Sequence, residues 1–160
     1  MNIAKPYAPG DTERELILSR VYDAPRELVF RAWTDPKHLA RWWGPEHFTN
    51  PVCEVDARVG GKLRIVMRAP DGNDYPLRGV FQEVVAPERL VFTNIAVDEK
   101  DRPIIDGLTT VTFVEQGGKT RLTLHTRGTA VQPVAVQYLQ GMEMGWTQSL
   151  EKLAALLPKL

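Results

Sequence analysis

The side chains that most often carry out catalysis are sparse in this sequence, and their spacing matches no catalytic or metal-binding pattern. Cys53 is the only cysteine, so no disulfide within the chain, no multi-thiolate zinc site and no Cys-x-x-Cys redox pair can form. His38, His47 and His125 lack metal-ligand spacing, and we interpret all three as structural. A serine nucleophile elbow and a phosphate-binding glycine loop are both missing. We therefore predict no catalytic residue, no metal site and no cofactor.

The carboxylates beside Cys53 do not indicate an acid/base pair either. Glu54 and Asp56 are two residues apart, so in an extended strand both point to the same face. Cys53 alternates with Glu54 and is predicted to point inward, where a thiol behaves as a small hydrophobic side chain. We expect the two carboxylates to be solvated.

Large apolar side chains are better candidates, because they could line a binding pocket. Trp42 and Trp43 each bring a large apolar area and one indole donor. Large aromatic side chains are usually buried for packing alone, so we predict that Trp42 packs in the core beside Trp33. Trp43 is then the candidate for the mouth of a pocket.

Further candidates come from predicted strands and from a predicted C-terminal helix. They are Met67, Phe81 and Phe92 on strands and Tyr138, Met142 and Trp146 on the helix. The face of Phe81 is not fixed, because Gly79 to Val85 does not alternate cleanly. Asn94 would share the face of Phe92 and could anchor a polar group in an apolar pocket, although we favour a turn residue at a strand end.

Two glycines interrupt the predicted helix. Gly141 and Gly145 lie one turn apart at the edge of its apolar face, and each costs about 1 kcal/mol relative to alanine. Two explanations stand side by side. The missing side chains leave room for a ligand beside Tyr138 and Met142, or they allow a strand or a second short helix to approach closely.

The helix itself is predicted from Pro133 to Leu157 and ends at Pro158. A continuous helix of this length measures about 37 Å. One face is apolar, and the opposite face carries Gln137, Gln140, Thr147 and Glu151. The apolar face comprises Ala135, Tyr138, Leu139, Met142, Trp146, Leu150, Leu153 and Leu157.

The N-terminal part predicts one strand and two short helices. Leu16 to Tyr22 is rich in aliphatic residues and suits a first strand. Asp23-Ala24-Pro25 offers a capping side chain ahead of a helix from Arg26 to Thr34. Pro36 ends that helix and suits the first turn of a second one that runs through Trp42.

The middle of the chain has the two-residue period of half-buried strands. Apolar residues alternate with polar ones at Leu63, Ile65 and Met67, at Val111 and Phe113, and at Leu122 and Leu124. Turns are predicted at Gly60-Gly61, Pro70 to Asn73, Pro87-Glu88, Asp106-Gly107 and Gly117-Gly118. Short turns join antiparallel neighbours.

Length and charge limit the possible functions. The 160 residues suit one domain, and Lys+Arg and Asp+Glu both number 20, so no strong overall field attracts nucleic acid or an anionic membrane. Residues 1–14 are polar and contain neither the apolar run of a signal peptide nor a membrane span, which predicts a flexible tail in a cytoplasmic protein. Residues 15–160 are predicted to form a single domain.

The predicted sheet and helix each have one apolar face, and neither can leave that face in water. We therefore predict an α+β fold. A curved antiparallel sheet wraps around the long C-terminal helix, and two short helices follow the first strand.

Several motifs follow one another in order over roughly residues 15 to 157. They are Ala24-Pro25, Val29-Phe30, Trp33-Thr34-Asp35-Pro36, Arg41-Trp42-Trp43-Gly44-Pro45, Asp56-Ala57-Arg58-Val59-Gly60-Gly61, Gly79-Val80-Phe81, Pro87-Glu88-Arg89-Leu90-Val91-Phe92-Thr93 and Gly145-Trp146 with Leu150 and Leu153. Together they resemble the family named for the activator of the ninety-kilodalton heat-shock-protein ATPase. The resemblance implies the helix-grip fold of START-like and birch-pollen-allergen-like domains (the SRPBCC superfamily), a cavity between sheet and helix, and no obligatory metal or cofactor. Residues 15–160 would then form a single START-like ligand-binding domain. The eukaryotic activator has a separate N-terminal domain that binds the chaperone, with an Asn-rich motif ending in Trp-His-Trp, and this sequence contains neither.

The leading hypothesis is a module that binds a small, mainly apolar molecule between sheet and helix. A second hypothesis is a co-chaperone that regulates a heat-shock ATPase through its outer surface. A third is a cofactor-free cyclase or hydrolase, which rests on analogy with relatives of the superfold. The identity of the ligand and the oligomeric state do not follow from the sequence.

Overall fold

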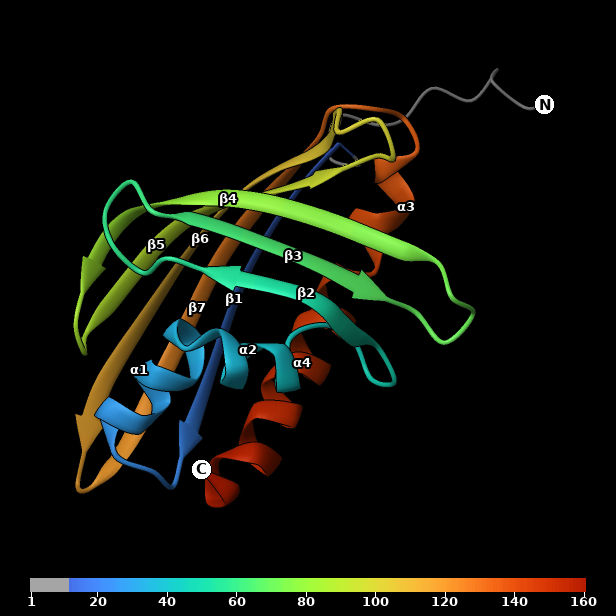
Figure 1. Ribbon diagram of the computed structural model, residues 1–160. Coiled ribbons are helices and arrows are strands. Elements are labelled where there is room, and N and C mark those ends of the chain that lie inside the picture. Colours follow the sequence, from blue (N-terminus) through green and yellow to red (C-terminus); the bar gives the residue numbers. More distant parts are fainter. Residues whose placement is uncertain (1–11) are drawn as a thin grey trace.

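A computed structural model describes residues 12–160, which form an α+β fold (Figure 1). Within this range a seven-stranded antiparallel sheet, two short helices after the first strand and a C-terminal helical segment confirm the predicted helix-grip architecture. The strands are β1 (Glu13–Tyr22), β2 (Thr49–Val55), β3 (Lys62–Arg68), β4 (Asp74–Val85), β5 (Arg89–Val97), β6 (Pro103–Gln116) and β7 (Lys119–Ala130). The helices are α1 (Arg26–Thr34), α2 (Pro36–Trp42), α3 (Ala135–Gln140) and α4 (Met142–Leu156), followed by the short 3-10 helix η2 (Leu157–Lys159).

The strand order in the sheet is β1-β7-β6-β5-β4-β3-β2. Strands β2 to β7 therefore pair in chain order, while β1 pairs with β7. The sheet is strongly bent, so that β2 to β4 run at a steep angle to β1 and β7 (Figure 1). Its concave face meets the helices, and the predicted alternation is confirmed there: Leu63, Ile65, Val111, Leu122 and Leu124 are all buried.

Two glycines permit close approach of neighbouring strands in the bent sheet. A Cβ atom on Gly79 would lie 1.7 Å from the carbonyl oxygen of Thr93, and one on Gly107 would lie 2.6 Å from that of Asn94. No side chain fits at such distances. The turn predicted at Asp106-Gly107 is therefore wrong: Gly107 lies inside β6 because the strand beside it leaves no room for a side chain.

The N-terminal helices begin and end where the sequence predicts, but the first cap differs. Pro25 is the N-cap of α1 and makes no side-chain capping bond, so the predicted cap from Asp23 is wrong. At α2, Asp35 accepts a hydrogen bond of 2.9 Å from the backbone N–H of Lys37. Strand β1 starts at Glu13, which pairs with Thr129 and so belongs to the sheet rather than to the predicted tail. Residues 1–11 of that tail lie outside the described residues.

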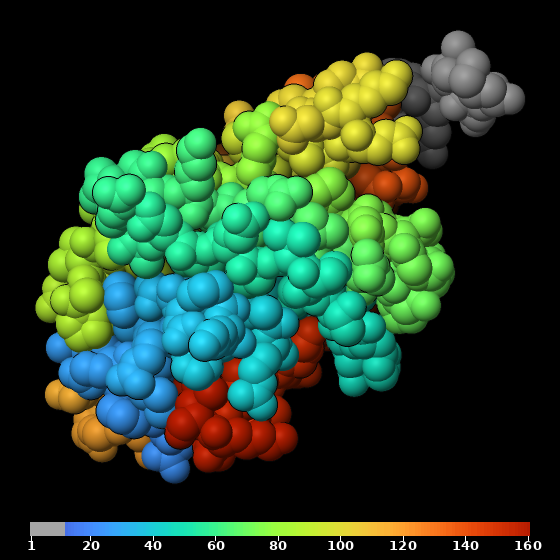
Figure 2. Space-filling view, in the orientation of Figure 1, coloured from blue at the N-terminus to red at the C-terminus, as the bar shows by residue number. Residues whose placement is uncertain are grey.

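The C-terminal helix is not continuous, which corrects the prediction. Gly141 ends α3, where its N–H bonds to the carbonyl of Tyr138, and it also forms the N-cap of α4. Helix α3 lies beside the hairpin between β5 and β6, as Figure 2 shows, and Gln132 just before it donates to the carbonyl of Pro103 at 2.9 Å. Neither these helices nor the others between residues 12 and 160 are long and apolar enough to cross a bilayer.

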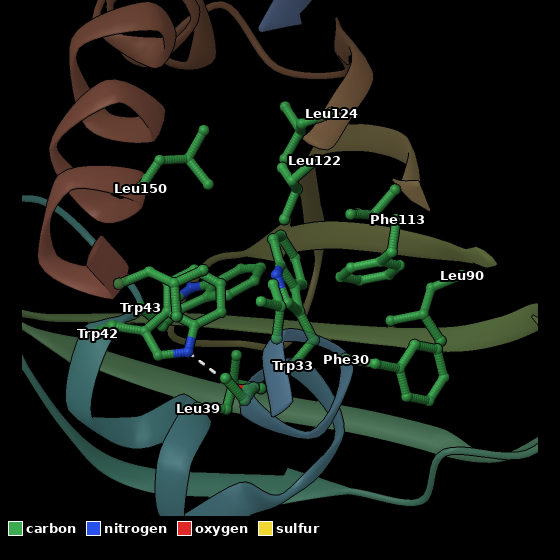
Figure 3. Close-up of a cluster of buried hydrophobic side chains, with 14 of the residues drawn as sticks. Phe30, Trp33, Leu39, Trp42, Trp43, Leu90, Phe113, Leu122, Leu124 and Leu150 are labelled. Atoms are coloured by element: carbon green, nitrogen blue, oxygen red, sulfur yellow. Dashed lines mark hydrogen bonds between the residues drawn. The ribbon is translucent and has the colours of Figure 1, made fainter. Parts of the chain in front are cut away.

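An aromatic core fills the space between α1, α2, the sheet and α4 (Figure 3). The rings of Trp33 and Trp42 meet edge to face with their centroids 4.6 Å apart. The indole nitrogen of Trp42 donates a 2.9 Å hydrogen bond to the carbonyl of Ala32, so its buried polar atom is satisfied. Trp42 is fully buried, which confirms its predicted place in the core beside Trp33.

Candidate functional site: a cavity between the sheet and the C-terminal helices

A cavity of about 760 Å³ lies between the concave face of the sheet, helices α3 and α4, and the loop that follows α2. Its wall is mainly apolar. The sheet contributes Met67, Tyr75, Pro76, Leu77, Asn94, Ala96, Val97, Ile104, Ile105, Thr126 and Gly128, the helical side contributes Tyr138, Gly141, Met142, Gly145, Trp146 and Ser149, and the loop contributes Trp43, Gly44, Pro45 and Phe48.

Trp146 forms the aromatic end of this cavity. Its ring stacks on Trp33 with centroids 6.1 Å apart and planes 18° from parallel, and it meets the edge of Trp43 at 5.0 Å. Trp43 is only 5% exposed. It therefore lines the cavity from within, which corrects its predicted position at the mouth.

Helix α4 holds the loop that carries Trp43. The hydroxyl of Ser149 donates to the carbonyl of Gly44 at 2.9 Å, and the ammonium of Lys152 donates to the carbonyls of Gly44 and Pro45 at 3.2 Å each. Burial lowers the pKa of Lys152. These bonds draw the loop against the helix, which explains why the Trp43 ring is buried.

Aromatic rings from both walls meet at the opposite, more exposed end. The ring of Tyr75 on β4 contacts the edge of Tyr138 on α3 with centroids 6.2 Å apart, and Phe48 lies 6.1 Å from Tyr75 on the other side. Tyr138 is 38% exposed. These three rings thus connect the sheet, the loop after α2 and α3 at the rim of the cavity.

One polar side chain faces the cavity from the middle of the sheet. Asn94 lies within β5 and lines the cavity, so the turn position that we favoured is wrong and the polar-anchor position matches the geometry. Its amide oxygen accepts a 2.8 Å hydrogen bond from the hydroxyl of Thr109 on β6. Thr109 is fully buried, which makes this bond part of the interior.

Comparison with known proteins identifies the family. The family described as Activator of Hsp90 ATPase homolog 1-like protein matches residues 23–158, which is most of the chain. The chain belongs to this family. The resemblance seen in the sequence motifs is thereby confirmed.

Solved structures share the fold of this Activator of Hsp90 ATPase homolog 1-like chain. A protein from Chromobacterium violaceum is 35% identical with a TM-score of 0.78, covering 89% of this chain and 96% of its own. The AHSA1 protein from Silicibacter pomeroyi is 30% identical with a TM-score of 0.76, covering 91% of this chain and 98% of its own. Among curated proteins, none matches the chain significantly.

Six of the eight predicted binding residues line the cavity of this family member: Trp43, Met67, Asn94, Tyr138, Met142 and Trp146. The other two, Phe81 and Phe92, do not. Their rings lie 5.7 Å apart, both residues are 2% exposed, and Trp33 and Trp43 cover Phe92 at 6.4 and 6.5 Å. They belong to the core beneath the cavity, because the tryptophans fill the space in front of them.

The glycines of the helical wall are not tightly packed. A Cβ atom on Gly145 would lie 3.7 Å from Cγ of Pro45, and one on Gly141 would lie 3.7 Å from the carbonyl oxygen of Tyr138, both ordinary contacts. Close approach of another element therefore does not explain them. Both glycines line the cavity, and Gly141 also marks the break between α3 and α4.

The titratable groups singled out in the sequence lie away from the cavity wall. Burial raises the pKa of the Cys53 thiol to about 11, which disfavours a reactive thiolate. His125 pairs with Glu15 at 2.6 Å on the surface, and His38 lies 3.6 Å from Asp35. Within residues 12–160 no group of three or more His, Cys, Asp or Glu side chains is arranged to hold a metal ion.

Two residues of the interior, both threonines, were not identified from the sequence. Thr109 and Thr126 are buried on adjacent strands, and Thr126 lines the cavity. The sequence pattern could have identified them, because Thr109 is two residues from buried Val111 on β6 and Thr126 is two residues from buried Leu124 on β7. Residues two apart in a strand share a face, so both hydroxyls lie on the inner face. A threonine on an inner face has to find a hydrogen-bond partner there.

Proposed function

We propose that this protein binds a small, mainly apolar molecule in the cavity between the sheet and helices α3 and α4. The observation that carries the proposal is the cavity itself, whose volume of about 760 Å³ falls within the roughly 300–1,000 Å³ of ligand pockets. Protein interiors normally leave few voids larger than a water molecule. A space of this size with a mainly apolar wall is suited to an apolar guest.

The composition of the wall supports the same function. Trp146 and Met142 offer polarisable apolar surface, and methionine adapts its shape to different guests. Gly145 contributes no side chain at a position where alanine would stabilise the helix by about 1 kcal/mol. Room inside the cavity offsets that loss.

The proposal is tested by filling the cavity. Met142 lines it, whereas Met144 is 67% exposed on the same helix and does not, so Met144→Trp is a matched control for Met142→Trp. Binding is followed with the uncharged dye phenylnaphthylamine, by energy transfer from the tryptophans. Since Trp43 and Trp146 form the wall, a dye in the cavity quenches their emission.

We expect the dye to bind wild type and Met144→Trp with equal affinity and to bind Met142→Trp at least about tenfold more weakly. The melting temperature of Met142→Trp is expected to equal or exceed that of wild type. Overpacking a filled core instead costs about 1–3 kcal/mol. A destabilised Met142→Trp that binds dye as well as wild type would contradict the proposal. If the proposal holds, native mass spectrometry of protein purified from its own host would identify the natural ligand.

The family description supports a second candidate, regulation of a heat-shock ATPase through the outer surface. The family match covers residues 23–158 and so includes nearly every described element. A pull-down with the host's ninety-kilodalton chaperone, followed by an ATPase assay, tests this function. A change in ATPase rate that persists in Met142→Trp would favour the surface over the cavity.

A further inference from the structure

A row of three hydrogen-bonded polar side chains crosses the floor of the cavity on strands β5, β6 and β7. The hydroxyls of Thr126 and Thr109 lie 2.8 Å apart, and the Thr109 hydroxyl lies 2.8 Å from the amide oxygen of Asn94. Thr109 and Thr126 are 0% and 1% exposed. The row is therefore part of the interior, and only its two ends, Asn94 and Thr126, line the cavity.

The donor and acceptor of each hydrogen bond in this row follow from the number of protons available. Each hydroxyl has one proton, and an amide oxygen can only accept. Thr109 donates its proton to Asn94, so it must accept the proton of Thr126. The Asn94 oxygen is thereby held by the sheet, and its Nδ2 group, with two protons, has no hydrogen-bond partner within residues 12–160.

Glycines keep this amide uncovered. Gly107 pairs directly with Asn94 across the strands, and Gly128 pairs with Gly107 on the next strand. A Cβ atom on Gly107 would lie 2.9 Å from Nδ2 of Asn94, so any side chain there would press on the amide group. The missing side chain of Gly107 leaves the donor group uncovered, while Gly128 makes room for Leu139, which a Cβ atom there would meet at 3.0 Å.

The charges around the cavity decide which acceptor suits this donor. The rim carries three carboxylates, Asp74, Asp98 and Glu99. The one basic residue of the wall in the described range, Arg127, points to the outer face by strand alternation and pairs there with Glu15 at 3.2 Å. Asp74 and Asp98 are ion-paired with Arg68 and Arg102, so the rim repels an anion only weakly, but an anionic ligand would lose its hydration inside the cavity without gaining a cation as partner.

We propose that the cavity selects apolar molecules with one uncharged acceptor oxygen, such as a ketone, aldehyde or ester carbonyl, which accepts a hydrogen bond from Nδ2 of Asn94. This inference rests on the proposed function and adds the class of ligand. A bound hydrocarbon would cover the Nδ2 group without offering it an acceptor, so the matching carbonyl gains affinity over a hydrocarbon of the same shape. The apolar part of the ligand then lies against Met142 and Trp146.

The test uses three naphthalenes of similar size with the full-length protein. Acetylnaphthalene has a neutral carbonyl, ethylnaphthalene has no acceptor, and naphthoate is anionic. We expect wild type to bind acetylnaphthalene about tenfold more tightly than ethylnaphthalene, the ratio that corresponds to about 1.4 kcal/mol. Naphthoate is expected to bind most weakly, because its carboxylate would be desolvated in a cavity where no cation of the described residues faces it.

Two variants examine the donor and its positioning. Asn94→Leu removes the amide, and Thr109→Val removes the bond that fixes the amide orientation while keeping the shape of the side chain. Both variants are expected to bind the ketone and the hydrocarbon equally. Thr110→Val is the control, because the side chain of Thr110, next to Thr109 on β6, points to the opposite face of the sheet; this variant is expected to keep the wild-type preference. The infrared carbonyl band of bound acetylnaphthalene is expected at lower frequency in wild type than in Asn94→Leu.

The outcomes separate the two proposals. Equal binding of ketone and hydrocarbon by wild type overturns the carbonyl inference and leaves cavity binding intact. Tightest binding of naphthoate overturns it as well, because the acceptor would then be an anion. Failure of all three compounds to bind counts against the proposed function itself.

Discussion

The hydroxyl of Tyr22, the last residue of β1, donates a 3.0 Å hydrogen bond to the backbone carbonyl of Leu150 in α4. Tyr22 is 4% exposed and Leu150 is fully buried, so the bond ties the edge strand to the helix inside the core. A buried hydrogen bond contributes about 0.5–1.5 kcal/mol net.

Tyr22→Phe is therefore expected to lower the free energy of unfolding by about 1 kcal/mol, measured by urea denaturation. Tyr138→Phe is the control, because its ring lies at the exposed rim and no described residue bonds its hydroxyl. An equal loss in both variants would show that the bond to Leu150 does not hold β1 to α4.

Trp146→Ala is expected to cost about 3 kcal/mol, the lower end of the range for truncating a buried aromatic residue. The ring packs on Trp33 and Trp43 on one side, but it is only partly buried because it also lines the cavity. Thermal and urea unfolding measure the loss. A cost below roughly 1 kcal/mol would mean that the stacked arrangement contributes little to stability.

Gly145→Ala and Gly79→Ala are expected to change stability in opposite directions. The new methyl group at position 145 meets Pro45 at an ordinary 3.7 Å, so the helix propensity of alanine stabilises the protein by about 1 kcal/mol. At position 79 it would meet the carbonyl oxygen of Thr93, which is backbone and cannot move aside. We expect a loss of more than about 3 kcal/mol or failure to fold.

The protein is expected to lose stability at alkaline pH because of Cys53. Its pKa is raised from 9.0 to about 11 by burial, so the native state keeps the proton that the unfolded chain releases. The stability that the buried thiol contributes is fully present below pH 9 and is lost as the pH rises through about 11. The stability difference between wild type and Cys53→Ala should therefore shrink between these values, as urea melts at several pH values would measure. A constant difference would mean that the thiol is not buried.

The sequence predicted the two N-terminal helices better than the sheet or the C-terminal helical segment. The bounds of α1 and α2 follow from local chemistry, since Pro25, Asp35 and Pro36 restrict the backbone whatever lies around them. Gly107 was misplaced in a turn because the reason for a glycine there is the carbonyl of Asn94 on the next strand. The break at Gly141 was likewise missed, because the apolar period continues across it.

The candidate site was predicted in part for the same reason. Met142 and Trp146 could be found because helical spacing alone places them on the apolar face. Phe92 has the same strand pattern as a cavity residue, but tryptophans from another element cover it. The bond between Asn94 and Thr109 depends on how β5 and β6 pair, which alternation along a single strand does not determine.

The position of β1 beside β7 sets the order in which the sheet can assemble. Glu13 pairs with Thr129, whereas each strand from β2 to β6 pairs with the strand that follows it along the chain. During synthesis the N-terminal segments emerge first, so β1 has no strand to pair with until β7 has been made. Closing such a long loop is slow compared with forming consecutive hairpins. We therefore expect β1 to be ordered last among the strands of this sheet, and until then the bond from Tyr22 that secures α4 cannot form.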